Sequence, residues 1–407
     1  MIPLAAALAA CGGDDVPRAV DRPGFWFSEQ GGPLRDATGS LGYAQGYEPA
    51  AGRWTGLRVH DPEAAYLEPL LFSSGHEAAA HVLHPDGRIE RRWALEDAPN
   101  RAERGPRLQH PTQQAWRRVE PLPGGDLLVI HEGLCLMRLG PDSTIRWRGV
   151  PGAHHDLLVD GATAWVLDRE VTPPTEEELG RRPDAGPLVT RDGLVRVDLE
   201  GGATLSRASL TELDGGDTWR AAAGEALRRA RRVEIGDTSP GGRLRLALDP
   251  LHANALARLD PSRGAPTVFL RELGAFLDVA DDLTRIDRVI ATPYLGAHDP
   301  QLDPADGRVL LFDNFGAQAV PRSRVLSLDL ERGDARTLFD GAGEEAFFSP
   351  VCGAVLPLPG ERLLILESTA GRAVQVDREG RVLWEFRTPF RIPEEDLVAV
   401  LLDMRPL

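Results

Sequence analysis

The sequence of 407 residues has no lysine and only three cysteines, and all 46 of its basic residues are arginines. Acidic residues number 62, so the formal net charge is −16. Nucleic-acid-binding proteins carry basic patches and a high isoelectric point, so this charge balance excludes nucleic acid as an expected partner. No apolar stretch reaches the roughly 20 residues that a transmembrane helix needs.

The first cysteine is set apart from the other two. Cys11 ends the stretch ALAACGG directly after an apolar run, a pattern typical of the lipobox of a bacterial lipoprotein. We therefore expect residues 1–11 to be a lipoprotein signal, acylated at Cys11, on a protein exported to the bacterial cell envelope and anchored to the membrane by this lipid. A secretory signal also has a basic start and a longer apolar region, which favours a start further upstream. An unstructured Ala-rich segment is the alternative.

Cys135 and Cys352 are distant in sequence, and each is flanked by apolar residues. This setting favours two buried free thiols over a disulfide.

Repeats dominate the chain after its first part. Residues 12–65 are rich in Gly, Pro and Asp, and we expect a linker and an irregular lead-in there. In residues 66–407, short β-rich runs alternate with D-G, P-G and E-G turns at a period of about 40–50 residues, which makes six units. Radial closure of four-stranded units leaves only short sheet edges. The pattern therefore predicts an all-β fold, a six-bladed β-propeller, with a two-domain β-sandwich as the alternative.

Two features complete this prediction. We expect residues 395–404 to close the ring as an outer strand of the first blade. Several units end in tryptophan, and we expect these side chains to pack within the blades: Trp93, Trp147 and Trp384.

One part of the third unit breaks the β pattern. Residues 217–234 are rich in Ala, Leu and Arg near helical spacing, and residues 172–180 resemble a helix start. We predict a short helical insertion at about 172–235, either a surface decoration or a lid beside the mouth of the propeller.

Four of the ten histidines stand where a strand follows a turn, at matching places in their units: His154 and His155 in GAHHD, His252 in DPLHANAL and His298 in GAHDP. Equivalent repeat positions face one end of a propeller's channel, so we expect these side chains to converge. The structural alternative is that the imidazoles brace turns by bonding to Asp156 or Asp299.

Clustered imidazoles suit metal binding, acid–base catalysis or nucleophilic catalysis. These histidine motifs contain no H-E-x-x-H pair and no third donor at a zinc spacing, so neither a metal nor a cofactor is expected. His252 and Asn254 are two residues apart and share one face of a strand. Because an amide does not titrate, we expect Asn254 to hold an oxygen or to fix a histidine tautomer.

An ordered set of motifs across roughly residues 55–390 resembles the bacterial arylsulfotransferase family, which transfers sulfuryl groups without a nucleotide donor. The motifs are GAHHDLLVD at 152–160, DPLHANAL at 249–256, VFLRELG at 268–274, GAHDPQLDPADGRVLLFDN at 296–314, SRVLSLD at 323–329 and GRAVQVDREGRVLWEF at 371–386. The resemblance is that of a divergent member. It implies a propeller with an active site at the channel mouth, an aryl sulfate donor and a phenolic acceptor.

The resemblance also implies residue roles. His298 matches the histidine that becomes sulfated, and His154 or His155 matches the first histidine of the family's site. His252 and Asn254 match a His-x-Asn element, and Arg271 matches the arginine that follows it. The implied mechanism is a sulfohistidine intermediate on His298, with the sulfuryl oxygens held by Arg271, His252 and Asn254 and the proton moved by a second histidine. A surface position is the alternative for Arg271.

Other interpretations stay open at this point. A non-catalytic propeller lipoprotein would bind a ligand or partner at the cell envelope, and a hydrolase would use water as the acceptor. Asp313, Asn314 and Ser323–Arg324 also recur in the family pattern, and we expect them to brace turns and blades.

Overall fold

The computed structural model describes residues 47–50, 52, 54–95, 115–172, 189–214, 251–315, 322–341, 347–393 and 396–407. The predicted lipobox with Cys11 and the predicted helix at 217–234 lie outside these residues. Within them, regular structure consists of β-strands and one 3-10 turn, η2 (Ser368–Ala370). None of the helical structure in these ranges is long and apolar enough to cross a membrane.

Six antiparallel sheets have four or five strands each, and strands that follow one another in the chain are neighbours in the sheet. Their strands are β28 (Leu401–Pro406), β3 (Leu70–Ser74), β4 (Ala79–Leu83) and β5 (Ile89–Ala94); β6 (Trp116–Pro121), β7 (Leu127–His131), β8 (Cys135–Leu139) and β9 (Ile145–Gly149); β10 (Ala153–Asp160), β11 (Thr163–Thr172), β12 (Val189–Asp198) and β13 (Thr204–Ser209); β14 (Ala253–Ala257), β15 (Thr267–Leu270), β16 (Ala275–Val279) and β17 (Ile286–Ala291); β18 (His298–Leu302), β19 (Val309–Asp313), β20 (Arg324–Leu328) and β21 (Ala335–Phe339); β22 (Ala354–Leu358), β23 (Arg362–Glu367), β24 (Arg372–Val376), β25 (Val382–Arg387) and β2 (Gly56–Val59). A seventh sheet of three strands joins β1 (Tyr47–Pro49), β27 (Leu397–Ala399) and β26 (Arg391–Ile392).

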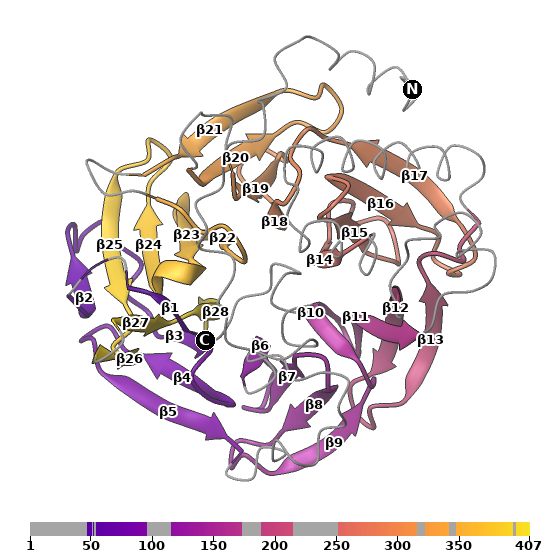
Figure 1. Ribbon diagram of the computed structural model, residues 1–407, viewed down its shortest axis with the longest axis horizontal. Coiled ribbons are helices and arrows are strands. Elements are labelled where there is room, and N and C mark those ends of the chain that lie inside the picture. Colours follow the sequence, from indigo (N-terminus) through magenta and orange to yellow (C-terminus); the bar gives the residue numbers. More distant parts are fainter. Residues whose placement is uncertain are drawn as a thin grey trace.

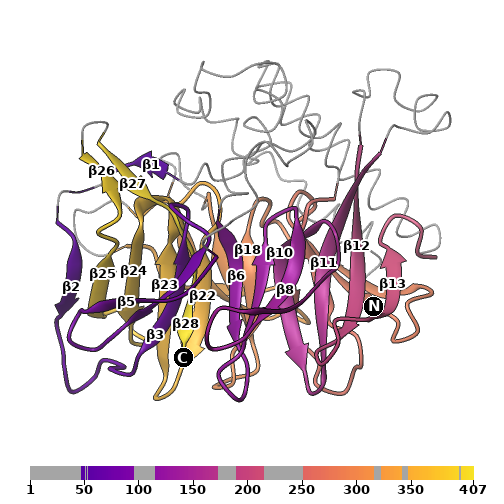
Figure 2. The same cartoon turned by 90° about the horizontal axis from the view of Figure 1, so that it is seen from below.

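The large sheets are arranged in a ring, which is the architecture of a β-propeller (Figure 1). The strands nearest the centre are β28, β6, β10, β14, β18 and β22 (Figure 1). Seen from the side, the sheets stand next to one another around the ring (Figure 2). The ring excludes the β-sandwich alternative.

Ring closure differs from the sequence prediction. The strand β28 pairs with β3 at the inner end of its sheet, with Met404 opposite Phe72, so the expected outer strand was wrong in position. The reason is that the chain enters this sheet at β3, so the place left for a strand is the innermost one. The lead-in is also less irregular than expected, because β1 pairs with β27 and β2 pairs with β25.

The region predicted as an insertion contains two regular strands. Both β12 and β13 lie within 172–235 and complete the sheet that starts at β10. Residues 173–188 and 215–235 of that range lie outside the described residues.

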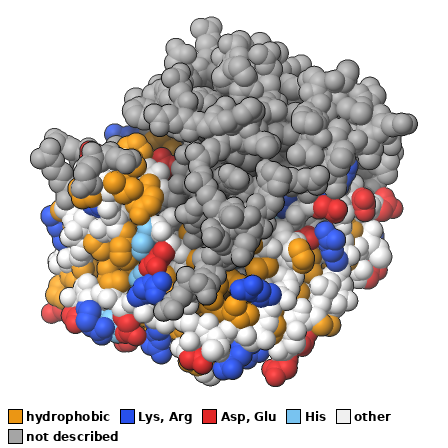
Figure 3. All heavy atoms as spheres, turned by 60° about the horizontal axis from the view of Figure 1, so that its bottom comes forward, with side chains coloured by type: hydrophobic (Ala, Val, Ile, Leu, Met, Phe, Trp, Pro, Cys, Tyr) orange, Lys and Arg blue, Asp and Glu red, His pale blue; other side chains and the backbone are white. Residues whose placement is uncertain are grey.

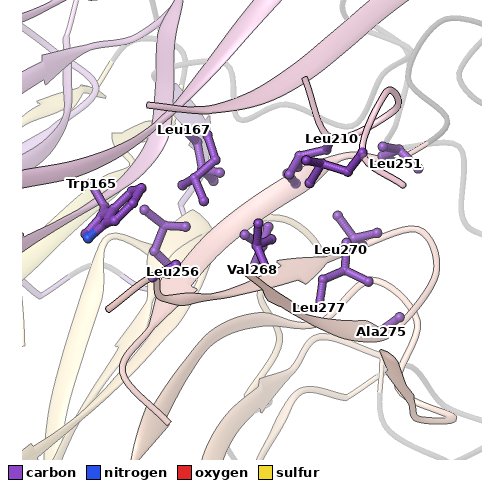
Figure 4. Packing of buried hydrophobic residues seen from close by; sticks show 14 of the residues in the cluster. Trp165, Leu167, Leu210, Leu251, Leu256, Val268, Leu270, Ala275 and Leu277 are labelled. Atoms are coloured by element: carbon purple, nitrogen blue, oxygen red, sulfur yellow. The ribbon is translucent and has the colours of Figure 1, made fainter. Parts of the chain in front are cut away.

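Apolar side chains fill the space between neighbouring sheets. Between the sheet of β10–β13 and the sheet of β14–β17, Trp165 and Leu167 pack towards Leu256 and Val268 (Figure 4). Full burial of one such side chain stabilises the fold by about 1.5–3 kcal/mol. These layers hold the inner strands at fixed positions around the axis.

The tryptophans and cysteines follow the prediction in most respects. Trp93 and Trp384 are buried, and the half-buried Trp147 donates its indole N–H to Leu199 O at 2.9 Å. Cys135 and Cys352 are both free thiols, of which only Cys352 is fully buried. On the described part of the face in Figure 3, acidic and basic side chains are interspersed.

Candidate functional site

The inner strands begin with a strained backbone. Four non-glycine residues at or just before these strands have φ in the left-handed region: His155 (56°), His252 (48°), Asp299 (48°) and Cys352 (59°). The pairing register also shifts at the starts of β10, β14 and β18. Left-handed non-glycine residues cost about 1–3 kcal/mol each and cluster at functional sites. Because of these left-handed residues, side chains at the strand starts do not alternate between the two faces of the sheet as they do in a regular strand.

His155 and His252 meet across two sheets. Their Nε2 atoms are 3.2 Å apart, and their rings lie edge to face with centroids separated by 5.0 Å. One of the two nitrogens must carry a hydrogen and the other must accept it. Burial lowers the pKa of His155 well below its usual range, and the neighbouring His154, His252 and Arg117 add to this effect. His155 is therefore neutral at pH 7.

His298 belongs to the same cluster and has a defined tautomer. Its Nδ1 lies 2.8 Å from Oδ1 of Asn314. The Asn314 amide donates to Ser349 O at 2.7 Å and to Cys352 O at 2.6 Å, which fixes the direction of Oδ1. Because Oδ1 only accepts, Nδ1 of His298 carries the hydrogen and Nε2 keeps its lone pair.

The charge state of His298 follows from its surroundings. Burial lowers the pKa of His298 well below its usual range. The positive charge of Arg271 lowers it further, Arg117 and His252 act in the same direction, and the Asn314 bond only partly offsets them. His298 is thus a neutral imidazole beside two arginines.

The two histidines of GAHHD lie edge to face, with ring centroids 4.9 Å apart, but they contact different partners. His154 Nε2 lies 3.4 Å from Asp192 Oδ1, and this carboxylate also accepts bonds from Arg169 Nε at 2.8 Å and from the backbone N–H of Ala253 at 2.7 Å. His154 therefore packs against a structural ion pair, while His155 faces His252. The cluster is centred on His155, His252 and His298, and His154 packs against its edge through the ring of His155.

Arg271 is a buried residue, with 2% of its surface exposed, so the surface alternative was wrong. Its NH1 atom lies 2.5 Å from Glu272 Oε1, and this oxygen is 3.9 Å from His252 Nδ1. Asn254 donates its amide to Ala297 O at 3.0 Å, which links β14 to the start of β18. No described residue donates to Asn254 Oδ1.

Several neighbours of this cluster were missed by the sequence analysis. Arg117 donates to Cys352 Sγ at 2.9 Å, and Glu132 accepts the backbone N–H of His155 at 3.0 Å. A signal for some of them exists in the sequence, because an acid or amide stands at or just after the second strand of a sheet in five cases: Glu77, Glu132, Glu272, Asn314 and Glu367. Arg117 belongs to no motif.

A layer of carboxylates lies next to the histidines along the inner strands. Asp156, Asp299 and Asp403 come from β10, β18 and β28, and each accepts a backbone N–H from the next inner strand: Leu256 at 2.8 Å, Val355 at 3.0 Å and Val119 at 2.9 Å. Arg118 lies within salt-bridge distance of all three. These contacts differ from the structural alternative, in which the imidazoles bond to Asp156 or Asp299, because the carboxylates bond to neighbouring strands and to an arginine.

The pKa values of the three carboxyl groups in this layer shift in different directions. Burial raises the pKa of Asp156 to about 6 and also raises that of Asp299, although Arg118 opposes both shifts. Burial also acts on Asp403, but Arg405 and Arg118 together lower the pKa of Asp403 below its usual value.

The architecture and this cluster define a β-propeller with histidines and arginines gathered at the start of its inner strands. No protein-family model matches the chain, and no curated protein matches it in sequence. Among solved structures, it is similar to a protein of unknown function from Bacteroides caccae, with 13% identity and a TM-score of 0.47 over 82% of this chain and 99% of that one. It is also similar to virginiamycin B lyase from Staphylococcus aureus, with 10% identity and a TM-score of 0.41 over 85% of this chain and 88% of the lyase. None of these likenesses says what this chain does.

Proposed function

We propose that the chain is a six-bladed β-propeller enzyme that transfers a sulfuryl group from an aryl sulfate to a phenol through a sulfohistidine on His298. The observation that carries this proposal is the state of His298. A neutral imidazole with its hydrogen on Nδ1 presents the Nε2 lone pair, which is the form that attacks an electrophilic sulfur.

The first half-reaction forms the N–S bond and breaks the S–O bond to the aryl group. Negative charge then develops on the leaving phenolate and on the sulfuryl oxygens. Arg271 and Arg117 place positive charge beside His298, and charge-assisted hydrogen bonds of this kind stabilise such oxygens. The guanidinium of Arg271 already bonds to the Glu272 carboxylate, so the sulfuryl group must compete with Glu272 for this guanidinium.

The proton balance involves His155 and His252. An anion beside a buried imidazole raises its pKa, so the pair takes up one proton from solvent as the phenolate forms and delivers it to the leaving oxygen. In the second half-reaction the incoming phenol returns one proton to the pair, attacks sulfur and breaks the N–S bond. One phenol is exchanged for another with no net change in protons.

A second candidate is a non-catalytic propeller that binds an anionic ligand or a partner. The short contact between Arg271 and Glu272 favours it, because that contact neutralises one of the two charges that catalysis needs. In either case we propose that Cys11 is the lipid anchor to the cell envelope, which incorporation of labelled palmitate into wild type but not into Cys11→Ala would support.

The decisive experiment uses 4-nitrophenyl sulfate with and without phenol. We expect nitrophenol release that requires phenol, and loss of release in His298→Ala. The matched control is His60→Gln, which changes a half-exposed histidine on a rim segment (46% of its side chain exposed) and should leave the rate unchanged. Equal release by wild type and His298→Ala would contradict the mechanism. No release with any acceptor would favour the binding function, and release independent of phenol would favour a hydrolase.

A further inference from the structure

A second group of histidines lies on the first sheet, at the turn between β3 and β4. His76 and Glu77 are in the turn, and His81 is the third residue of β4. Each of the three offers one donor atom, and these atoms lie within 4.8 Å of one another. Glu77 has the same place in its sheet as Glu132 has next to His155, so this group and the histidine cluster face the same end of the ring.

The donor atoms are spaced as ligands of a small metal ion. Glu77 Oε1 is 3.1 Å from Nε2 of His76 and 3.1 Å from Nε2 of His81. In a tetrahedral zinc site with bonds of about 2.0–2.2 Å, neighbouring donor atoms are about 3.4 Å apart. A lengthening of both oxygen–nitrogen distances by a few tenths of an ångström would therefore give the donor spacing of a zinc site.

Neighbouring groups hold these donors in place. Ser74 Oγ lies 2.5 Å from Nδ1 of His76, so a hydrogen on Nδ1 leaves Nε2 as the acceptor atom. Arg91 holds the carboxylate of Glu77, with Nε at 2.9 Å and NH2 at 2.8 Å from Oε2. Arg91 Nε also lies 3.1 Å from Oε1, the oxygen that is close to both imidazoles. Metal-binding histidines and carboxylates are typically oriented by such outer partners.

Aromatic rings fix the imidazole planes. His76 stacks on Phe390 with ring centroids 3.7 Å apart, and His81 stacks on Phe72 at 5.1 Å. His81 has only 2% of its side chain exposed, whereas Glu77 has 28%, so the group is reached from solvent on one side. Burial lowers the pKa of His81 to about 4, which keeps its nitrogens neutral at pH 7.

We propose that His76, Glu77 and His81 bind one divalent first-row transition-metal ion, for which Zn²⁺ is the best fit. Two imidazoles and one carboxylate leave a fourth position open for water or a substrate oxygen, as in catalytic rather than structural zinc sites. The opposing charges of Glu77 and Arg91 cancel, so ligand geometry rather than net charge sets the affinity. This site is separate from the residues proposed for sulfuryl transfer.

The test measures metal binding directly and does not depend on any activity. The full chain, freed of metal by a chelator and dialysed, is titrated with Zn²⁺ by calorimetry and with Co²⁺ while visible absorption is recorded. We expect one ion per chain, with the intense visible bands of tetrahedral Co²⁺. His76→Gln and Glu77→Gln should each weaken binding by at least about tenfold.

The control is His84→Gln, which removes another His–Glu contact of the same strand region. His84 Nε2 lies 3.1 Å from Glu90 Oε2 without a third donor of this kind among the described residues, so its loss should leave the affinity unchanged. Circular dichroism of each variant shows that it is folded. Absence of Co²⁺ bands in wild type, or equal affinity of wild type and His76→Gln, would overturn the proposal.

Discussion

Two neighbouring layers of the inner strands show opposite uses of buried polar groups. The histidine layer contains His155, His252 and His298, and the carboxylate layer contains Asp156, Asp299 and Asp403. They are adjacent in sequence at 155–156 and 298–299. Each carboxylate accepts a backbone N–H from the next strand and lies near Arg118, whereas the Nε2 atoms of the histidines meet each other or keep a lone pair. Groups that are fully bonded to the protein stabilise the ring, and groups that keep a reactive lone pair are suited to chemistry.

The largest expected effect separates the two layers by activity. His298→Ala should reduce transfer from 4-nitrophenyl sulfate by at least about 10³-fold, because it removes the nucleophile itself. The same change should leave the melting temperature nearly unaltered, which differential scanning calorimetry checks. A large fall in melting temperature would place His298 with the structural layer instead.

Asp403→Ala should mainly lower the stability of the fold. Asp403 is buried and bonded to Val119 N, and it balances Arg118 and Arg405. Leaving buried arginines without this partner should destabilise the fold by about 3–5 kcal/mol, measured by urea unfolding. If stability were unchanged, the carboxylate layer would not be the brace of the ring.

Asn314→Ala should give an intermediate result, because Asn314 serves both functions. It fixes the tautomer of His298 and bonds to the carbonyls of Ser349 and Cys352. We expect kcat to fall by about 10²-fold and stability to fall by about 1–3 kcal/mol. If Asn314→Ser restores activity but not stability, the two roles are separable. If Asn314→Ala lowers stability but leaves activity unchanged, Asn314 has no role in catalysis.

The smallest effect is a pH dependence of stability. Burial raises the pKa of Asp156 from its ordinary value of 3.8 to about 6, so the folded protein binds a proton more tightly than the unfolded chain between these values. Stability from this group is therefore gained as pH falls from about 6 to 4 and lost as pH rises, by on the order of 1–3 kcal/mol in total. Urea unfolding from pH 4 to 7 should show this slope in wild type and a smaller one in Asp156→Asn; equal slopes would contradict it.

The strand pattern predicted the sheets well because turn dipeptides and apolar runs are local signals. The equivalent repeat positions of His252 and His298 also predicted that these residues lie in one cluster. The pattern did not tell His154 from His155, since the left-handed backbone at His155 decides which side chain turns inward. Nor did it place β28, although this strand is buried like the inner strand β14, whereas the outer strands β5 and β9 have exposed positions.

Two other residue sets could not be found by spacing. Arg117 reaches Cys352 across 235 positions, and no motif links them. His76, Glu77 and His81 do not follow the H-E-x-x-H spacing of a helix, since a β-turn and a strand bring their donor atoms together.

The pairing of β28 with β3 has a consequence for the timing of folding. The innermost strand of the first sheet is made after every other described strand, so the ring stays open while the rest of the chain is synthesised. Contacts between such distant segments slow folding, and Phe72 and Leu71 lack their partners until Met404 and Arg405 are in place. Among the described strands, the ring can therefore close only once β28 has been made, so closure joins the first sheet to the last strand of these ranges.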